Sequence, residues 1–386
     1  MGQYNAPLRD MQFVLHELLH AGDTLKTLPP YVDVDVDVIN QVLEEGGKFA
    51  SEVLFPLNHS GDREGCHLNK ETHEVTPPKG FKEAYQKYVE AGWPAMPCDP
   101  EYGGQGLPMV VNNAFFEILN SANQAWSMYP GLSHGAYECL HAHGTPEQKA
   151  LYLPKLVSGE WTGTMNLTEP QAGSDLALVR TRAEPLPDGT FKVFGTKIYI
   201  TYGEHDMAEN IVHLVLARVQ GAPEGVKGIS LFVVPKFMVK ADGSLGDRND
   251  VHCVSIEHKM GIKASPTAVL QYGDHGGAIG YLVGEENRGL EYMFIMMNAA
   301  RYAVGVQGIA IAERAYQKAV QYAKDRVQSR PVDGSMNTSA PIIHHPDVKR
   351  MLMTMRARTE ACRSLATVAA AAYDAAHHHP DTEVRK

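Results

Sequence analysis

Local clusters of cysteine are absent from this sequence of 386 residues. No CxxC pair occurs, and the five cysteines stand far apart: Cys66, Cys98, Cys139, Cys253 and Cys362. This spacing argues against a zinc ribbon and against a thioredoxin-like redox site. Scattered free thiols are typical of a reducing compartment, so we expect a cytoplasmic protein.

An excess of positive charge is lacking as well. The chain has 35 Lys and Arg against 45 Asp and Glu, which gives a net charge of −10. A general nucleic-acid binder needs a basic face, so that class is not expected. Apolar runs stay short of the roughly 18 residues that a transmembrane helix requires. The first apolar stretch contains Arg9, Asp10 and Glu17, so we expect no signal peptide.

The pattern of the chain changes twice. The composition, 44% hydrophobic and 21% charged, is that of a globular protein, and the length allows two or three domains. Helical apolar spacing dominates residues 1–160, and β-branched runs bounded by Gly, Pro and Asp dominate residues 161–280. Helical spacing returns in residues 281–386. We therefore expect an α+β protein with a helical domain, an antiparallel sheet or barrel, and a helical bundle.

Single elements support this division. Thr145, Pro146 and Glu147 form a helix start with a cap, a first-turn proline and an acid. Asp188-Gly189 between two strand-like runs predicts a hairpin. Residues 290–327 contain almost no breaker, and so long a helix needs partners along its length. A second helix is expected from Asp347 to about Tyr373. The alternating Val and Asp of residues 32–38 imitate a strand, but here predict a linker or the approach to a helix.

Two short segments contain the most specific pattern. Asn166–Asp175 reads as a strand that runs into a loop of small polar residues and glycine, and Lys197–Thr201 reads as a strand. Tyr199 and Thr201 lie two residues apart and so share one face of that strand. The hydroxyl and backbone N–H groups of such a pair of segments can reach a planar cofactor and a phosphate. The glycines of 103–106 do not follow a strand, so they are no dinucleotide fingerprint.

These segments resemble the flavin-binding strands of acyl-CoA dehydrogenases. The usual pattern of those strands is T-E-P-x-A-G-S-D, followed later in the chain by K-x-W/Y/F-I-T/S. Further similar pieces are Glu101–Gly106, Lys259–Lys263, Gly284–Gly289 and Asp325–Arg330, so the resemblance covers the whole chain. The opening Tyr4–Met11 resembles the branch with an N-terminal extension that includes 3-methylmercaptopropionyl-CoA dehydrogenases. Members of that branch are usually much longer. The order of helical, sheet and helical domains also matches the family fold.

The resemblance implies an FAD enzyme that removes two hydrogens from Cα and Cβ of an acyl-CoA. It implies that a carboxylate takes the α proton, that the flavin takes the β hydride, and that the electrons pass to an electron-transfer flavoprotein. The residues that it implies for FAD are Met165, Leu167, Thr168, Gly173, Ser174, Tyr199, Thr201, Arg326 and Gln328. The last two match a segment that reaches the neighbouring subunit's FAD, which implies at least a homodimer.

For the substrate, the resemblance implies Ser174, Asn298 and Arg301. Many relatives have Asp where this chain has Asn298. Several of these residues also have an ordinary structural explanation, and Ser174 can be a plain turn former. Thr168 can be a plain strand threonine, Tyr199 a core aromatic and Arg301 a solvated helix residue. Arg326 can complement the end of a helix dipole. No metal site is expected, because His377–His379 is too local to form one and His344-His345 precedes a helix.

The catalytic base has no candidate. In most relatives the essential Glu follows a glycine-rich segment that lies beyond Lys386 of this sequence, and the alternative position holds Ala300. We therefore expect either that the base lies beyond Lys386 or that the chain binds flavin and acyl-CoA without oxidising it. An acyl-CoA oxidase stays open as a further alternative. The resemblance permits a methylthio-acyl or a straight acyl thioester, and the broader fatty acyl class is expected.

Overall fold

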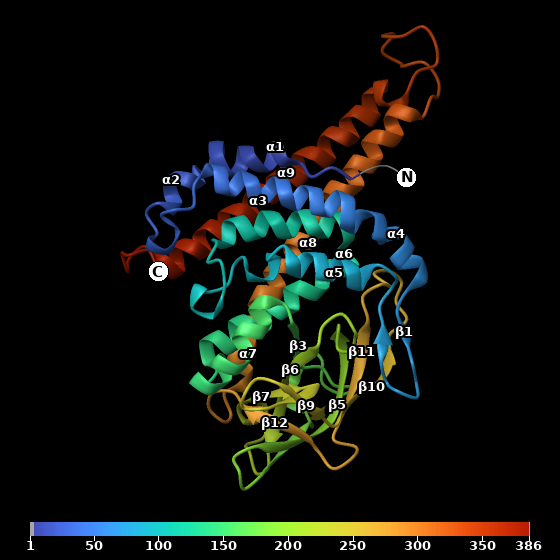
Figure 1. Cartoon of the computed structure of the whole chain (residues 1–386). Helices are drawn as coiled ribbons and strands as arrows, with labels where there is room; N and C mark the ends of the chain where they lie inside the picture. Colours follow the sequence, from blue (N-terminus) through green and yellow to red (C-terminus); the bar gives the residue numbers. More distant parts are fainter. Residues whose placement is uncertain (1–3, 386) are drawn as a thin grey trace. The chain divides into compact units, whose positions relative to one another are not determined.

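The computed structural model describes residues 4–385, which form two compact units (Figure 1). The strand unit consists of His59–Gly106 and Ala125–Tyr302. The helical unit consists of the residues through Asn58, Leu107–Gln124 and the residues from Ala303 onward. The three consecutive domains expected from the sequence stay a prediction, because each of these two units combines segments from separate parts of the chain.

An eight-stranded sheet forms the body of the strand unit, with the order β10-β11-β5-β12-β7-β6-β3 and β4 beside β5 and β6. The expected hairpin at Asp188-Gly189 joins β4 to β5, which pair antiparallel, and Gly189 has a φ of 85° that favours glycine. The strands are β3 (Trp161–Asn166), β4 (Arg182–Pro185), β5 (Phe191–Thr201), β6 (Asn210–Val219), β7 (Ser230–Pro235), β10 (Val251–Ile256), β11 (Thr267–Tyr272) and β12 (Ala278–Leu282).

The sheet is not antiparallel throughout. β3 pairs with β6 in parallel register from Trp161↔Asn210 to Asn166↔Val215, and β4 also pairs in parallel with β6. All other pairs of this sheet are antiparallel. The parallel pair arises because the chain leaves β3, builds β4 and β5, and re-enters the sheet beside β3 in the same direction. Alternation within each strand cannot reveal such a crossover.

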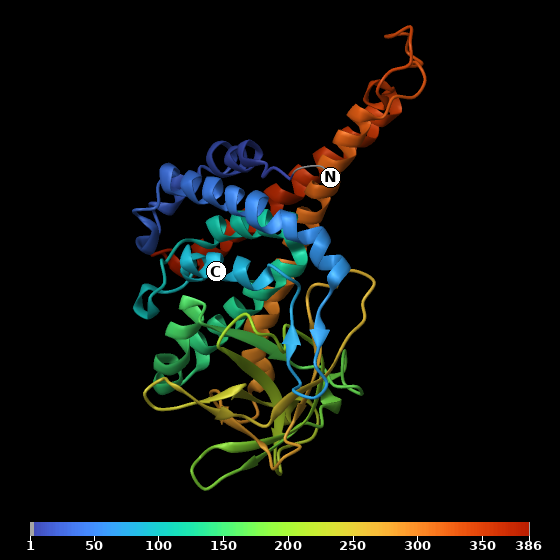
Figure 2. The same ribbon diagram turned by 45° about the vertical axis from the view of Figure 1, so that its right-hand side comes forward.

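Short helices and hairpins complete the strand unit. α5 (Phe81–Glu90) and α7 (Pro146–Ser158) lie wholly in this unit. Thr145 and Gln148 form a reciprocal capping box at α7, as the sequence predicts in part. The β1 (His67–Leu68) and β2 (Val75–Thr76) hairpin lies near β10, where His73 Nδ1 is 3.0 Å from the Cys253 carbonyl oxygen (Figures 1 and 2). β8 (Phe237–Val239) and β9 (Leu245–Arg248) form a separate ribbon.

The helical unit contains α1 (Leu8–Gln12), α2 (Ala21–Leu25), α3 (Val36–Phe49) and α9 (Pro346–His378). Asp35 caps α3 by accepting a hydrogen bond from Val38 N at 2.9 Å, so residues 32–38 approach a helix as expected. α4 (Phe55–Glu64), α6 (Met109–His143) and α8 (Gly289–Asp325) each contribute residues to both units. α6 is interrupted at Asn123, which has φ −154° and ψ 88°.

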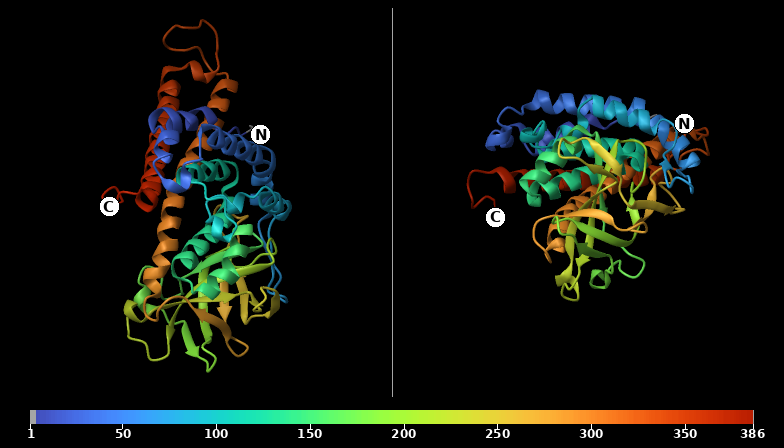
Figure 3. Two further views of the ribbon diagram at one scale, coloured as in Figure 1. Left: turned by 60° about the vertical axis from the view of Figure 1, so that its left-hand side comes forward. Right: turned by 60° about the horizontal axis from the view of Figure 1, so that its bottom comes forward.

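In the helical unit α9 runs antiparallel to the second half of α8, as the left view of Figure 3 shows. Arg363 on α9 ties them together. Its guanidinium donates to Glu117 at 2.7 Å and to Glu313 at 2.8 Å, with all three side chains nearly inaccessible to solvent. Large apolar side chains of α8 and α9 nevertheless remain exposed in this unit: Val304, Ile311, Tyr322, Met353, Leu365 and Val368.

Among the described residues one helix, α8, is long and apolar enough by length and composition to cross a membrane. No such helix was expected from the sequence. The first turns of α8 contribute Tyr292, Met293 and Met296 to a core shared with β6 and β7, as helices of globular proteins do.

Candidate functional site

A groove of about 600 Å³ lies in the strand unit, between the sheet and the first turns of α8. Its size is in the usual range of ligand pockets. Seven of the residues expected at the site line it: Met165, Leu167, Thr168, Gly173, Ser174, Tyr199 and Arg301. The other lining residues were not expected from the sequence: Asp175, Leu176, Ile198, Ile200, Val226, Leu290, Phe294 and Met297.

The two motif segments are joined directly by hydrogen bonds. The Ile198 N–H donates to the Thr168 carbonyl at 2.9 Å. The Lys197 ammonium donates to the Leu167 carbonyl at 2.9 Å and to Glu169 Oε1 at 2.8 Å. The lysine of one motif and the acid of the other thereby hold the two segments in one register, which two separate matches along the sequence do not reveal.

Glu169 is a buried carboxylate with many donors. Besides Lys197, it accepts from Arg180 N at 2.7 Å, Thr181 N at 3.0 Å and the Thr181 hydroxyl at 2.5 Å. Burial opposes ionisation, but Lys197 and these donors lower the pKa of Glu169 below its usual value. Burial also lowers the pKa of Lys197, to about 8, although Glu169 opposes that shift. Because each group faces a compensating partner, we assign an ion pair at neutral pH.

Tyr199 sits in an unusual backbone conformation at the edge of the groove. Its φ is 61° although it lies within β5, and the pairing of β5 with β11 shifts register here, between Leu270↔Lys197 and Ala268↔Ile200. This irregularity turns the Tyr199 ring out of the sheet, and 59% of the residue is exposed. A non-glycine residue in this region is strained by roughly 1–3 kcal/mol, and such strain concentrates at functional sites. The alternative interpretation of Tyr199 as an aromatic residue of the core is therefore wrong.

The loop after β3 leaves room and free donors. A Cβ built on Gly173 would meet only Thr168 Cγ2, at 3.8 Å, so nothing in the described chain fills that space. Among the described residues, the Gly173 and Ser174 N–H groups have no hydrogen-bond acceptor, and both residues are exposed. Free N–H groups on a small-residue loop suit an anionic oxygen. The groove therefore fits a planar ring along β3 and β5 with a phosphate at the loop.

The α8 wall of the groove combines apolar and cationic groups. The Arg301 guanidinium lies 5.2 Å from the centre of the Phe294 ring and donates to Asn298 Oδ1 at 2.8 Å. Both contacts orient an exposed arginine toward the groove that it lines. Asn298 itself does not line the groove, so here it positions Arg301. Phe294 and Met297 read in the sequence as ordinary apolar positions of a helix.

The remaining expected residues have other surroundings. Thr201 pairs with Thr267 at the end of β5 and does not line the groove. Arg326 and Gln328 follow α8 in the helical unit, where the Gln328 N–H donates to the Ala340 carbonyl. Their role at a flavin stays a prediction. Among the described lining residues only Asp175 has a carboxyl group, and its Oδ1 accepts from Ala177 N at 3.0 Å. No catalytic base is assigned.

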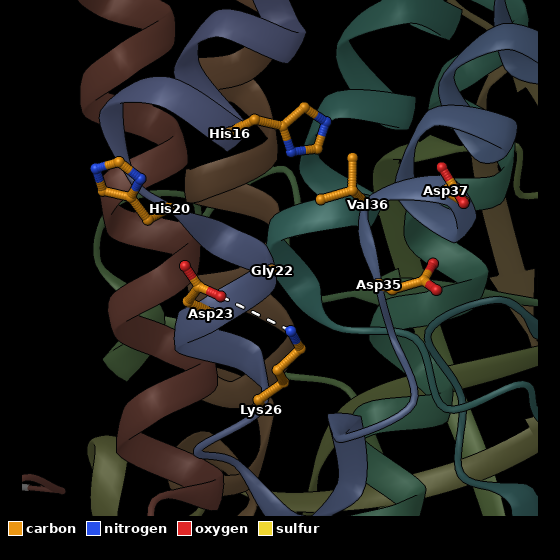
Figure 4. A pocket seen from close by; sticks show the side chains of 8 residues that line it. All are labelled: His16, His20, Gly22, Asp23, Lys26, Asp35, Val36 and Asp37. Atoms are coloured by element: carbon orange, nitrogen blue, oxygen red, sulfur yellow. Dashed lines mark ion pairs between the residues drawn. The ribbon is translucent and has the colours of Figure 1, made fainter.

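A second hollow, of about 210 Å³, lies in the helical unit and holds none of the expected site residues (Figure 4). His16 and His20 border one side, and Asp23 and Lys26 form an ion pair of 3.7 Å on another. Its acid Asp35 serves as the cap of α3. Asp23, Lys26 and Asp35 thus have local structural roles, and we assign the function to the groove in the strand unit, which contains the expected residues.

Models of three domains of one family match the chain in order: the acyl-CoA dehydrogenase N-terminal domain at residues 41–160, the middle domain at 164–274 and the C-terminal domain at 287–385. The chain is 54% identical over 98% of its length to a 3-methylmercaptopropionyl-CoA dehydrogenase of Ruegeria pomeroyi, covering 63% of that protein. It is 40% identical over 97% of its length to the broad-specificity linear acyl-CoA dehydrogenase FadE5 of Mycobacterium tuberculosis, covering 62%.

A solved acyl-CoA dehydrogenase of Bacillus anthracis complexed with FAD has the same fold, with a TM-score of 0.73 and 24% identity. The match covers 91% of this chain and 55% of that one. Together with the fold and the groove, these matches show that the chain belongs to the acyl-CoA dehydrogenase family, as its motifs predict. It spans just under two-thirds of the length of the curated relatives named above.

Proposed function

We propose that this chain binds FAD and an acyl-CoA in the groove and serves the α,β-dehydrogenation of the thioester to the trans-2-enoyl-CoA. The observation that carries the proposal is the pair of hydrogen-bonded segments, Met165–Asp175 and Lys197–Ile200, that form one wall of the groove. Family membership supports this reaction, in which Cα loses a proton and Cβ loses a hydride.

The chain's own residues bind and orient. Thr168 and Tyr199 line one wall, where a flavin would supply the hydride acceptor when it is bound. Gly173 and Ser174 offer free N–H groups to phosphate oxygens at the loop. Arg301, held by Asn298 and Phe294, supplies positive charge for the phosphates of the CoA portion. Apolar side chains of Leu290 and Met297 exclude water from the acyl end.

Anaerobic titration of the purified, FAD-loaded protein with acyl-CoA tests this proposal. Bleaching of the flavin absorbance, with slow reoxidation in air and fast reoxidation by an electron-transfer flavoprotein, is the expected result. Rapid peroxide formation would instead indicate an oxidase. Tight acyl-CoA binding without bleaching would favour a binding subunit, a second candidate that the lack of an assignable base among the described lining residues supports.

For the substrate we propose a fatty acyl-CoA. The relative at 40% identity is described as acting on linear acyl-CoA, whereas the relative at 54% is described as a 3-methylmercaptopropionyl-CoA dehydrogenase. Rates with butyryl-CoA, octanoyl-CoA and 3-methylmercaptopropionyl-CoA distinguish these classes. A kcat/KM that is at least tenfold higher for the methylthio thioester would overturn the fatty acyl proposal.

We also propose a homodimer in which Arg326 and Gln328 serve the partner's FAD. The exposed apolar side chains of α8 and α9 support a second copy as the occupant of that face, because large exposed apolar patches mark interfaces. Sedimentation equilibrium tests the assembly, and a monomer at micromolar concentration would contradict it. A cytoplasmic location is proposed from the five free cysteines, and cell fractionation tests it.

A further inference from the structure

A cluster of histidines and one aspartate lies in the strand unit, away from the residues that line the groove. Asp250 directly precedes β10, and His252 is the second residue of that strand. Residues two apart along extended backbone place their side chains on the same side. His275 comes from the turn between β11 and β12. One ligand atom from each of the three residues lies within 4.8 Å of the other two.

The spacing of these atoms is close to that of a metal site. Asp250 Oδ1 is 3.1 Å from His275 Nδ1 and 3.5 Å from His252 Nε2. Zn²⁺ binds such atoms at about 2.0–2.2 Å in tetrahedral geometry, which separates neighbouring ligand atoms by about 3.3 Å. The carboxylate and both imidazoles therefore already stand at ligand spacing.

The two oxygens of Asp250 have separate roles. Oδ2 accepts from the His275 N–H at 2.7 Å and from the Gly277 N–H at 3.0 Å, which fixes the carboxylate and leaves Oδ1 facing the two imidazoles. Support of this kind orients metal ligands in known sites. In the same turn Gly276 and Gly277 have φ values of 116° and 113°, which favour glycine.

The three ligands suit a metal ion, which binds carboxylates and neutral imidazoles. Arg248 lies two residues before Asp250 along the chain and is the positive charge to consider beside a bound cation. Arg248 repels a bound cation only weakly, because its positive charge is partly neutralised by the ion pair with Glu204 at 3.0 Å.

A fourth histidine lies next to the cluster. The rings of His73 and His252 have centres 5.4 Å apart, and His73 Nδ1 bonds the Cys253 carbonyl. A backbone partner on one nitrogen leaves the other nitrogen with a free lone pair, as in most histidine ligands. A small movement of this ring would supply a fourth ligand from the β1–β2 hairpin, and water would otherwise complete the shell.

We propose that Asp250, His252 and His275 bind one Zn²⁺ ion, which fastens the turn between β11 and β12 to the start of β10. Two nitrogens and one carboxylate oxygen match the ligand preference of zinc and disfavour Mg²⁺ and Ca²⁺, which prefer oxygen. The site is separate from the proposed flavin chemistry. A search for adjacent ligands along the sequence misses it, because His275 is distant from the other two.

Equilibrium dialysis of tag-free, chelator-treated protein against Zn²⁺ tests the site. One ion per chain with a dissociation constant in the micromolar range or below is expected. His275→Ala and His252→Ala should each weaken binding by at least about tenfold, the lower limit of what loss of a supporting partner costs. His258→Ala, an exposed histidine outside the cluster, is the matched control and should bind like the unmodified chain.

A spectroscopic readout distinguishes this site from loose binding at other histidines. Co²⁺ in the site should give the intense visible bands of a low-coordinate nitrogen and oxygen site, and these bands should vanish in His275→Ala. His275 is mostly exposed, so this variant should fold normally, which its circular dichroism checks. Equal affinity in the unmodified chain and both cluster variants would overturn the proposal, as would the absence of stoichiometric binding.

Discussion

Glu169 in the strand unit and Glu117 in the helical unit are both buried carboxylates beside a cation, but their surroundings differ. Glu169 has Lys197 and several neutral donors, and its pKa is lowered. Glu117 shares Arg363 with a second carboxylate, Glu313. Burial and Glu313 raise the pKa of Glu117 despite the arginine, and Arg363 Nη1 has no partner among the described atoms.

The difference separates two uses of buried charge. The pair of Glu169 and Lys197 is electrically balanced and surrounded by hydrogen bonds, and it joins the two strands that line the groove. The three charges of Glu117, Glu313 and Arg363 are unbalanced, and they hold α6, α8 and α9 together. Buried ion pairs contribute little net stability but are costly to break. We therefore expect the first cluster to govern flavin binding and the second to govern folding.

The largest loss of stability should follow Arg363→Met. It leaves two buried carboxylates without a cation, and breaking a buried pair costs about 3–5 kcal/mol of unfolding free energy. Glu117→Gln should lower the free energy of unfolding by less, because the Glu313 carboxylate and the Arg363 guanidinium then form a balanced pair. Urea unfolding checks both changes. If Glu117→Gln were less stable than Arg363→Met, this would contradict our assignment of an excess of negative charge to the buried cluster.

Lys197→Met should lower the free energy of unfolding by about 3 kcal/mol, the lower end of the range for breaking a buried ion pair. The loss is at the lower end because four neutral donors still bond to Glu169. Unlike Arg363→Met, it should also weaken FAD binding, because the lysine holds the Leu167 carbonyl beside the groove. Urea unfolding and flavin fluorescence measure the two effects. Lys240→Met, at an exposed lysine outside the groove, is the control and should change neither quantity.

Asp374 offers a test through pH. It accepts from Met109 N at 2.7 Å and Val110 N at 2.9 Å, and burial raises its pKa to about 6. The folded state therefore binds a proton more tightly than the unfolded state, whose pKa is about 3.9. The free energy of unfolding should fall by up to about 3 kcal/mol as pH rises from about 4 to 6. Asp374→Asn should remove this contribution, and an unchanged pH slope would contradict it.

The smallest effect is expected for Thr168→Val, which keeps the shape and removes the hydroxyl. One lost hydrogen bond of about 0.5–1.5 kcal/mol should weaken FAD binding by about two- to tenfold. Stability should change little, because the residue is only half-buried. Thr76→Val, an exposed strand threonine in β2, is the control. Unchanged FAD affinity in Thr168→Val would mean that this threonine is a plain strand residue.

Much of the site could be predicted because its two segments are contiguous in the sequence. Thr168, Ser174 and Tyr199 were found from local pattern and resemblance alone. The bond from Lys197 to Glu169 could not be found, because it depends on the pairing of distant strands. The helix wall with Phe294 and Met297 was missed since apolar helix residues read as core. The parallel pairing of β3 and β6 was missed because strand alternation does not encode direction.

The affinity of FAD for Lys197→Met and Arg363→Met, measured side by side under conditions where both are folded, tests the central claim most directly. We predict at least about tenfold weaker binding, or about 1.4 kcal/mol, for Lys197→Met and a change below about threefold for Arg363→Met. Equal weakening in both variants, or a larger effect of Arg363→Met, would contradict the assignment of flavin binding to the cluster beside the groove.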